Sequence, residues 1–278
     1  GDMANKGVEL ELNYIPVNKK NFTWKINLNL THYKNKITYL PDEKKTTVMD
    51  GHGGYMNGSR YYGEDLPINT WYMKRFAGLS EDGLSLWYYT DKETNEEKTT
   101  TTYSTGDFYL CGDPNPDLYG GFGTSITFHG FDLSTQFSYL VGGLTYDYGY
   151  AGMMGNPTAT SVGNRWHKDV LKAWSPENPS STIPRWYFND LNTTGSSDRF
   201  LIDGSYLNLQ NIQVGYTLPD SWTSHLKIKN LRLYFVCDNV YYWSKRKGLD
   251  PRRSISGVGT SGKIAPFRTY SGGISLQF

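Results

Sequence analysis

The sequence has few cysteines, no long apolar run and almost no net charge. Its two cysteines, Cys111 and Cys237, are too few for a disulfide framework, so we expect two free thiols. No window of about 18 uncharged apolar residues is present, which excludes a transmembrane helix. Strands that cross a membrane as about 9–11 alternating residues are not excluded. Lys and Arg number 28 against 27 Asp and Glu, and this net charge of +1 argues against a nucleic-acid surface.

Aromatic residues and glycine, in contrast, are abundant. The chain has 23 Tyr, 8 Trp and 30 Gly, although only 37% of its 278 residues are hydrophobic. Disordered chains combine few aromatics with a high net charge, so disorder is excluded. This composition is typical of a β-protein with many turns.

An alternation of apolar and polar side chains with a period of two runs through the first thirty residues. Apolar residues share one parity from Val8 to Tyr14, and the alternation resumes from Phe22 to Leu30. A helix would scatter these residues around its axis, whereas a strand places them on one face. The pattern therefore predicts a hairpin with a turn at residues 16–21.

Further strands are predicted along the rest of the chain. Residues 70–77 and 84–90 form a weaker hairpin, and residues 119–128 and 131–144 form a clear one around His129 and Gly130. Single strands are expected at 200–218, 230–243 and 270–278. The apolar phase changes within 200–218, which predicts a β-bulge near Gln210 and Asn211. Residues 145–198 are a long excursion that contains a short helix at about 165–174.

The connections between these strands alternate in length. Short turns are expected at about 16–21, 78–83, 129–130 and 219–227, and long ones at about 33–68, 91–117, 145–198 and 245–267. A soluble sandwich has no reason to place every long loop at one end, but an outer-membrane barrel does. The polar faces, with Glu9, Lys25, Asn27 and Gln136, suit a water-filled lumen.

Several segments resemble one family of proteins. Residues 1–9, GDMANKGVE, resemble the GxMxNKGVE strand of the SusC/RagA class of TonB-dependent outer-membrane transporters. The most specific match runs from Asp203-Gly204-Ser205 to Leu218-Pro219. The other segments that are similar, all in the same order as in the family, are 22–24, 33–37, 76–83, 116–122, 131–134, 231–234, 238–240 and 248–251.

The resemblance implies an all-β fold. Residues 1–278 would be the C-terminal part, about nine antiparallel strands, of a transmembrane β-barrel of about 22 strands with long extracellular loops. The plug domain and the earlier strands would be absent from this chain.

The resemblance also implies a location and a function. The protein would lie in the outer membrane of a Gram-negative cell and import a glycan or an oligopeptide together with a SusD-like surface lipoprotein. The TonB complex would act through the absent plug. Lipid and the missing N-terminal part of the same barrel would be the remaining partners, and no nucleic acid is expected.

Covalent chemistry is not expected. The five histidines are scattered, and none has the spacing of a zinc site. Residues 91–97 and 113–117 lack the spacing of a calcium loop, and no phosphate-binding or nucleophile motif is present. We therefore predict no catalytic residue, no metal site and no cofactor.

Two groups of residues are candidates for function. The aromatics of the long excursion, Trp166, Trp174, Trp186 and Tyr187, could contact a substrate or a lid, or could instead pack the loop onto its neighbours. In the last strand, the resemblance makes Tyr270, Ile274, Leu276 and Phe278 the signal that outer-membrane assembly machinery reads.

The rival hypothesis is a secreted soluble β-sandwich that binds carbohydrate through its aromatics. The two hypotheses differ in what covers the apolar face. That face includes Leu10, Leu12, Trp24, Leu28 and Ile274, which would contact a second sheet in a sandwich and lipid in a barrel.

Overall fold

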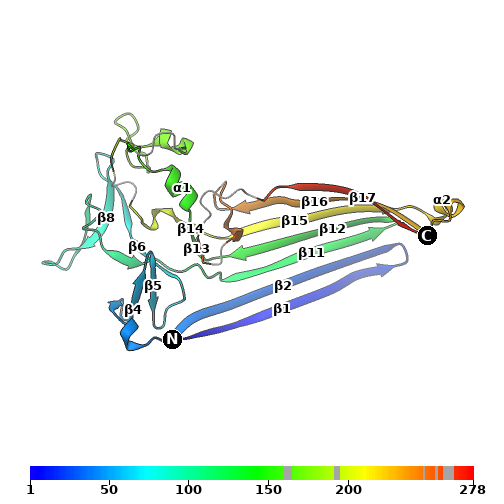
Figure 1. The fold of residues 1–278 in the computed structure, drawn as a ribbon, viewed down its shortest axis with the longest axis horizontal. Coiled ribbons are helices and arrows are strands. Elements are labelled where there is room, and N and C mark those ends of the chain that lie inside the picture. Colours follow the sequence, from blue (N-terminus) through cyan, green and yellow to red (C-terminus); the bar gives the residue numbers. More distant parts are fainter. Residues whose placement is uncertain (160–164, 191–194, 247, 254–255, 259–265) are drawn as a thin grey trace.

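The computed structural model describes residues 1–278 except 160–164, 191–194, 247, 254–255 and 259–265. Seven long antiparallel strands form one sheet, and the segments that join them on one side build a separate cap at one end (Figure 1). No helix in the described part of the chain is long and apolar enough to span a membrane. In spatial order, the strands of the sheet are β1 (Asp2–Lys19), β2 (Phe22–Tyr39), β11 (Leu118–Phe128), β12 (Phe131–Val141), β15 (Tyr206–Thr217), β16 (Asn230–Ser244) and β17 (Thr269–Gln277).

The strand register aligns the apolar side chains into rows across the sheet. One row is Leu12, Leu28, Phe122, Phe137, Leu209 and Tyr241, which are partners from β1 to β16. The row one residue further along is Asn13, Asn27, Gly123, Gln136, Asn211, Asp238 and Thr269. Because a slip of one residue would exchange the two faces, this pattern fixes the register. The sheet therefore has one apolar face and one polar face.

The apolar face is not covered by a second sheet in the described part of the chain. Leu10 is 51% exposed, Leu12 47% and Ile274 66%, whereas Trp24 and Leu28 are half-buried between their neighbours. A β-sandwich would bury all five residues in a core between two sheets. The sandwich hypothesis is therefore wrong for this fold.

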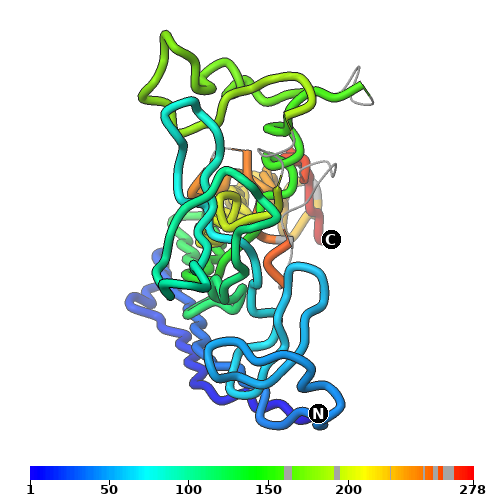
Figure 2. Tube along the Cα trace, turned by 90° about the vertical axis from the view of Figure 1, so that its left-hand side faces the viewer, coloured from blue at the N-terminus to red at the C-terminus, as the bar shows by residue number. Residues whose placement is uncertain are grey.

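The three long connections, residues 40–117, 142–205 and 245–268, form the cap. Figure 2 views the molecule from this end, with the cap in front of the sheet. The cap strands are β3 (Thr47–Met49), β4 (His52–Asn57), β5 (Arg60–Gly63), β6 (Thr70–Lys74) and β10 (Phe108–Leu110) in one sheet, β7 (Phe76–Leu79), β8 (Ser85–Thr90) and β9 (Glu97–Thr100) in a second, and β13 (Leu144–Tyr146) and β14 (Leu201–Asp203) in a third. The helices among the described cap residues are α1 (Tyr148–Met153) and the 3-10 turns η1 (Asp42–Lys44), η2 (Lys168–Lys172), η4 (Asp198–Phe200) and η6 (Pro251–Arg253).

The cap has its own hydrophobic core. Trp71, Met73, Tyr146, Met154 and Phe200 are buried together, and they come from two different connections. The indole nitrogen of Trp71 donates a hydrogen bond to the carbonyl oxygen of Leu144 at 3.1 Å, which ties β6 to β13. The third connection joins through the backbone, because the Tyr146 nitrogen donates to the Gly257 oxygen at 2.8 Å. The long loops are therefore one packed unit rather than independent excursions.

The opposite end of the sheet has short connections. His129 and Gly130, with φ of 47° and 87°, make the two-residue turn between β11 and β12, as a tight hairpin requires. Lys20 and Asn21 join β1 to β2, and the β15–β16 connection contains α2 (Asp220–Thr223) and η5 (Ser224–Leu226). Long loops at one end and short turns at the other match the predicted arrangement.

Some sequence predictions differ from the structure in detail. The long sheet has seven strands rather than about nine, because residues 70–90 form cap strands and the turn at 78–83 lies in the cap. The first turn is shorter than predicted, since β1 continues to Lys19 through a bulge between Tyr14 and Val17. The helix expected at 165–174 is only the 3-10 turn η2. The bulge at Gln210 is confirmed by register shifts on both sides of β15, and both cysteines are free.

Candidate functional site

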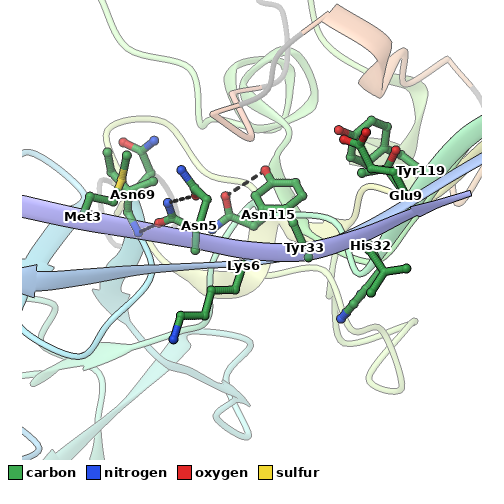
Figure 3. Close-up of a pocket in the computed structure, with 14 residues that line it drawn as sticks. Met3, Asn5, Lys6, Glu9, His32, Tyr33, Asn69, Asn115 and Tyr119 are labelled. Atoms are coloured by element: carbon green, nitrogen blue, oxygen red, sulfur yellow. Dashed lines mark hydrogen bonds between the residues drawn. The ribbon is translucent and has the colours of Figure 1, made fainter.

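A pocket of about 640 Å³ lies where the cap meets the polar face of β1 and β2 (Figure 3). Its wall on the sheet includes Asn5, Glu9 and Tyr33, which share the polar face by the strand register. Its wall on the cap side includes Asn69 and Asn115, which come from the connection between β2 and β11. The pocket thus joins residues that are up to about a hundred positions apart in the sequence.

Hydrogen bonds between amides build this pocket. The side-chain nitrogen of the buried Asn35 donates to the Asn5 side-chain oxygen at 2.6 Å, and the Asn35 oxygen accepts from the Ile68 backbone nitrogen at 2.7 Å. Asn35 therefore fastens the cap to the sheet. On the cap side, Asp113 orients Asn115. The Asp113 carboxylate accepts hydrogen bonds from the backbone nitrogen and from the side-chain nitrogen of Asn115.

The pocket offers neutral hydrogen-bonding groups next to aromatic rings. The rings of Tyr33 and Tyr119 lie edge to face with 6.1 Å between their centroids. Glu9 supplies the one carboxylate of the lining. No group of three or more His, Cys, Asp or Glu that could hold a metal ion occurs among the described residues. Amides and phenols of this kind suit a ligand rich in hydroxyl or amide groups rather than an ion.

Outside the pocket, side chains on the polar face form hydrogen bonds with one another. Arg232 donates two hydrogen bonds to Asp132, at 2.9 and 2.6 Å, and it crosses β15 above Gly215 to do so. A side chain at residue 215 would occupy the space of this guanidinium. Asn211 also donates to Asp238 at 2.6 Å. Polar side chains of neighbouring strands are therefore hydrogen-bonded to one another on this face.

The loop aromatics fall into two places. Trp166 and Trp186 meet edge to face at 5.6 Å, and both indole nitrogens donate to the carbonyl oxygen of Gly155, at 3.0 and 3.1 Å. Trp174 packs instead on the turn at Gly83, where a Cβ atom would clash with its ring. The structure therefore brings two of the four aromatics together and separates the third from them.

Tyr187 is the most accessible of the four aromatics. Its side chain is 55% exposed, and the Arg185 guanidinium lies 5.2 Å from its ring centroid. The adjacent Phe188 is 62% exposed, so two neighbouring rings face outward from this loop. Phe188 was not among the predicted site residues, although it directly follows Tyr187 in the sequence.

The predicted assembly residues of β17 also lie in the open. Tyr270, Ile274 and Phe278 are 62%, 66% and 72% exposed, and Leu276 shares their face. The Lys229 ammonium donates to the Phe278 carbonyl oxygen at 3.1 Å. This strand is one edge of the sheet, and β1 is the other.

Burial shifts the pKa of several groups in the cap. Arg60 lies over the Trp71 ring, 3.1 Å from its centroid, and desolvation lowers the pKa of this guanidinium to about 10. Desolvation likewise raises the pKa of the Cys111 thiol to about 11. Cys111 is therefore a neutral, weakly nucleophilic thiol near pH 7. These shifts reflect packing of the cap rather than a reactive centre.

Comparison with known proteins gives a consistent result. No family model matches the sequence. The TonB-dependent receptor P3 of Formosa agariphila is 28% identical over 308 residues, covering 100% of this chain and 29% of the relative. The TonB-dependent receptor SusC of Bacteroides thetaiotaomicron is 26% identical over 287 residues, covering 100% of this chain and 27% of the relative.

The fold of the chain also matches solved structures. The structure of the RagAB peptide transporter superposes with a TM-score of 0.80 at 24% identity, over 99% of this chain and 29% of that one. The closed-closed state of the RagAB peptide importer gives 0.80 at 25% identity, over 99% and 30%. The chain thus spans less than a third of the length of the proteins that it matches. The resemblance seen in the sequence is confirmed: over its whole length the chain is similar to one section of SusC/RagA-type TonB-dependent receptors, and its fold matches part of the RagA barrel.

Proposed function

We propose that this chain is the C-terminal section of an outer-membrane importer that takes up a glycan or an oligopeptide. The observation that supports this proposal most is the sheet, which has one apolar face, one polar face and a packed cap at one end only. In the longer transporter of which we propose this chain to be part, called the parent transporter below, the plug would respond to TonB. A SusD-like lipoprotein would cover the cap.

The dimensions of the apolar face support a membrane span. On β1 this face runs from Val8 to Val17, and both ends pair with residues of β2. Nine steps of about 3.4 Å give about 30 Å along the strand. With a strand tilt of about 35–45° this becomes a band about 23 Å tall, close to the apolar band of about 25 Å in outer-membrane barrels.

Two places are proposed to contact substrate or lid. The first is the pocket in Figure 3, whose neutral amides and phenols match a glycan or a peptide backbone. The second is the loop that contains Trp166, Trp186 and Tyr187, because the exposed Tyr187 ring can stack on a sugar or pack on an apolar side chain, while the paired rings of Trp166 and Trp186 are half-buried beside it in the same loop. Trp174 contributes by anchoring this loop to the turn at Gly83.

Replacing Asn5 with alanine tests the pocket. We expect this change to reduce uptake by the parent transporter about two- to twelvefold at low substrate concentration, because one hydrogen bond contributes roughly 0.5–1.5 kcal/mol. Uptake of labelled oligopeptide and oligosaccharide mixtures by intact cells measures the effect. The matched control is Asn13→Ala, since Asn13 lies on the same face of β1 but does not line the pocket. Equal uptake by the two variants would remove the pocket from the transport route.

A further inference from the structure

The apolar face of β1 and β2 ends in positive charge at the cap end. Lys6 and Lys34 are directly opposite each other in the register, and the next pair toward the other end is Val8 with His32. Figure 3 shows Lys6 and His32 leaving the strands on the side opposite to Asn5 and Tyr33, which is the apolar side. The Lys6 side chain therefore extends on the apolar side of the sheet, although Lys6 also contributes to the lining of the pocket, and Lys34 does not line the pocket.

This lysine pair lacks internal compensation. Like charges that are directly opposite in a sheet repel each other and destabilise the pairing. The next lysine on this face, Lys36, is neutralised by Asp65 of the cap, with 2.5 Å between ammonium and carboxylate. Among the described residues, Lys6 and Lys34 have no such partner, and both are exposed. An anion from outside the chain that lies against both ammonium groups would therefore stabilise the pair.

The position of the lysine pair indicates what kind of anion would bind there. Val8, Leu10 and Leu12 continue the same face and are 66%, 51% and 47% exposed. The change from apolar residues to lysine takes one step of two residues, about 7 Å along the strand. A ligand that touches both parts must carry hydrocarbon and negative charge at this spacing, as a phosphorylated lipid does. A soluble phosphate would gain nothing from the apolar neighbours.

We propose that Lys6 and Lys34 bind the phosphate of a lipid headgroup in the leaflet next to the cap, with His32 at the border of the site. This inference rests on the proposed function, because it requires the apolar face to lie in lipid. Two ammonium groups act as adjacent point charges on one phosphate, while the acyl chains of the lipid lie along Val8 and Leu10. The lipid removes the repulsion between the lysines and seals the sheet at its loop end.

The test is lipid binding to the detergent-purified parent transporter. Diphosphorylated lipid A and the same lipid after enzymatic dephosphorylation are titrated separately, and bound lipid is counted by native mass spectrometry. We expect the phosphorylated form to bind at least tenfold more tightly to the unmodified protein. Each lysine near a lipid surface contributes about a fivefold factor, so Lys6→Gln with Lys34→Gln should weaken binding about 30-fold.

Two controls make the result decisive. Lys6→Arg with Lys34→Arg keeps both charges and should retain binding, whereas Lys25→Gln removes a charge from the polar face and should change nothing. Equal affinity of the unmodified protein for both lipid forms would overturn the proposal even if the glutamine variant failed to assemble. Failure of the proposed function would give a different result in alkaline extraction of membranes. A protein that stays in the membrane after extraction has its apolar face in lipid, as the proposed function requires, even if it binds both lipid forms equally.

Discussion

Replacing Trp71 with alanine is expected to open the cap while the long sheet stays assembled. Trp71 is fully buried in the cap core, and its loss leaves a cavity whose cost for Trp→Ala is about 3–5 kcal/mol. The change also removes the hydrogen bond to Leu144 and the ring beneath the Arg60 guanidinium. The Arg60 guanidinium is desolvated, so the Trp71 ring is one of its few partners. Water can take the place of this ring only if the cap opens.

Limited proteolysis of the parent transporter measures this effect. Cleavage within residues 40–117 and 142–205 should rise about 150- to 5,000-fold, since it follows the population of the open cap. Heat-modifiable migration in gels should report an intact barrel. Phe188→Ala is the matched control, because this aromatic ring belongs to the cap but is 62% exposed. Equal cleavage of the two variants would mean that the long loops do not share one core.

The second large effect is expected at Leu28, in the middle of the apolar face. Leu28 lies between Leu12 and Phe122, and arginine there would place a charge near the centre of the bilayer. The cost in an outer-membrane barrel is about 2–4 kcal/mol near the midplane. Unfolding of the parent transporter in lipid vesicles by denaturant measures it.

The neighbouring residue provides the control for Leu28→Arg. Asn27→Arg changes the polar face, which already carries Lys25 on the same strand, and should cost less than about 1 kcal/mol. Both substitutions would disturb the pairing of β2 to a similar degree, so a difference in stability between them reports which face contacts the membrane. Equal destabilisation by both changes would contradict the assignment of the two faces.

The long sheet could be predicted from the sequence because its strands alternate over many residues. The rows that contain Leu12 and Asn13 are continuous across the sheet, so each strand carries the full signal on its own. The bulge at Gln210 could also be predicted, because the apolar residues change there from odd to even positions. Where one face meets lipid and the other meets water, local pattern and global fold agree.

The cap could not be predicted in the same way. All residues of β6, from Thr70 to Lys74, are buried, so this strand has no polar face that would mark its place. Even the Lys74 ammonium is enclosed, donating to the backbone oxygens of Tyr103 and Ser104. Alternation showed that strands exist near residues 70–90 but could not show which sheet they join.

The candidate site was only partly predictable for a related reason. Glu9 could be assigned to the polar face of β1 from the alternation alone, whereas Asn5 lies before Val8, where the alternation begins. Asn69 and Asn115 reach the pocket through loop geometry, and Asn69 has a left-handed φ of 62°. The packing of Trp174 on Gly83 likewise joins residues far apart in the chain, which no local pattern encodes.

The most direct test of the central claim is the facing of single cysteines in the parent transporter. With Cys237 replaced by serine, the Cys111 background should be low, because burial raises the pKa of its thiol to about 11. We expect cysteines at Leu10, Leu28 and Ile274 to react with a lipid-phase probe and cysteines at Asn27, Gln136 and Ser275 to react with a water-soluble one. The reverse pattern, or equal labelling of both sets by the water-soluble probe, would contradict the account.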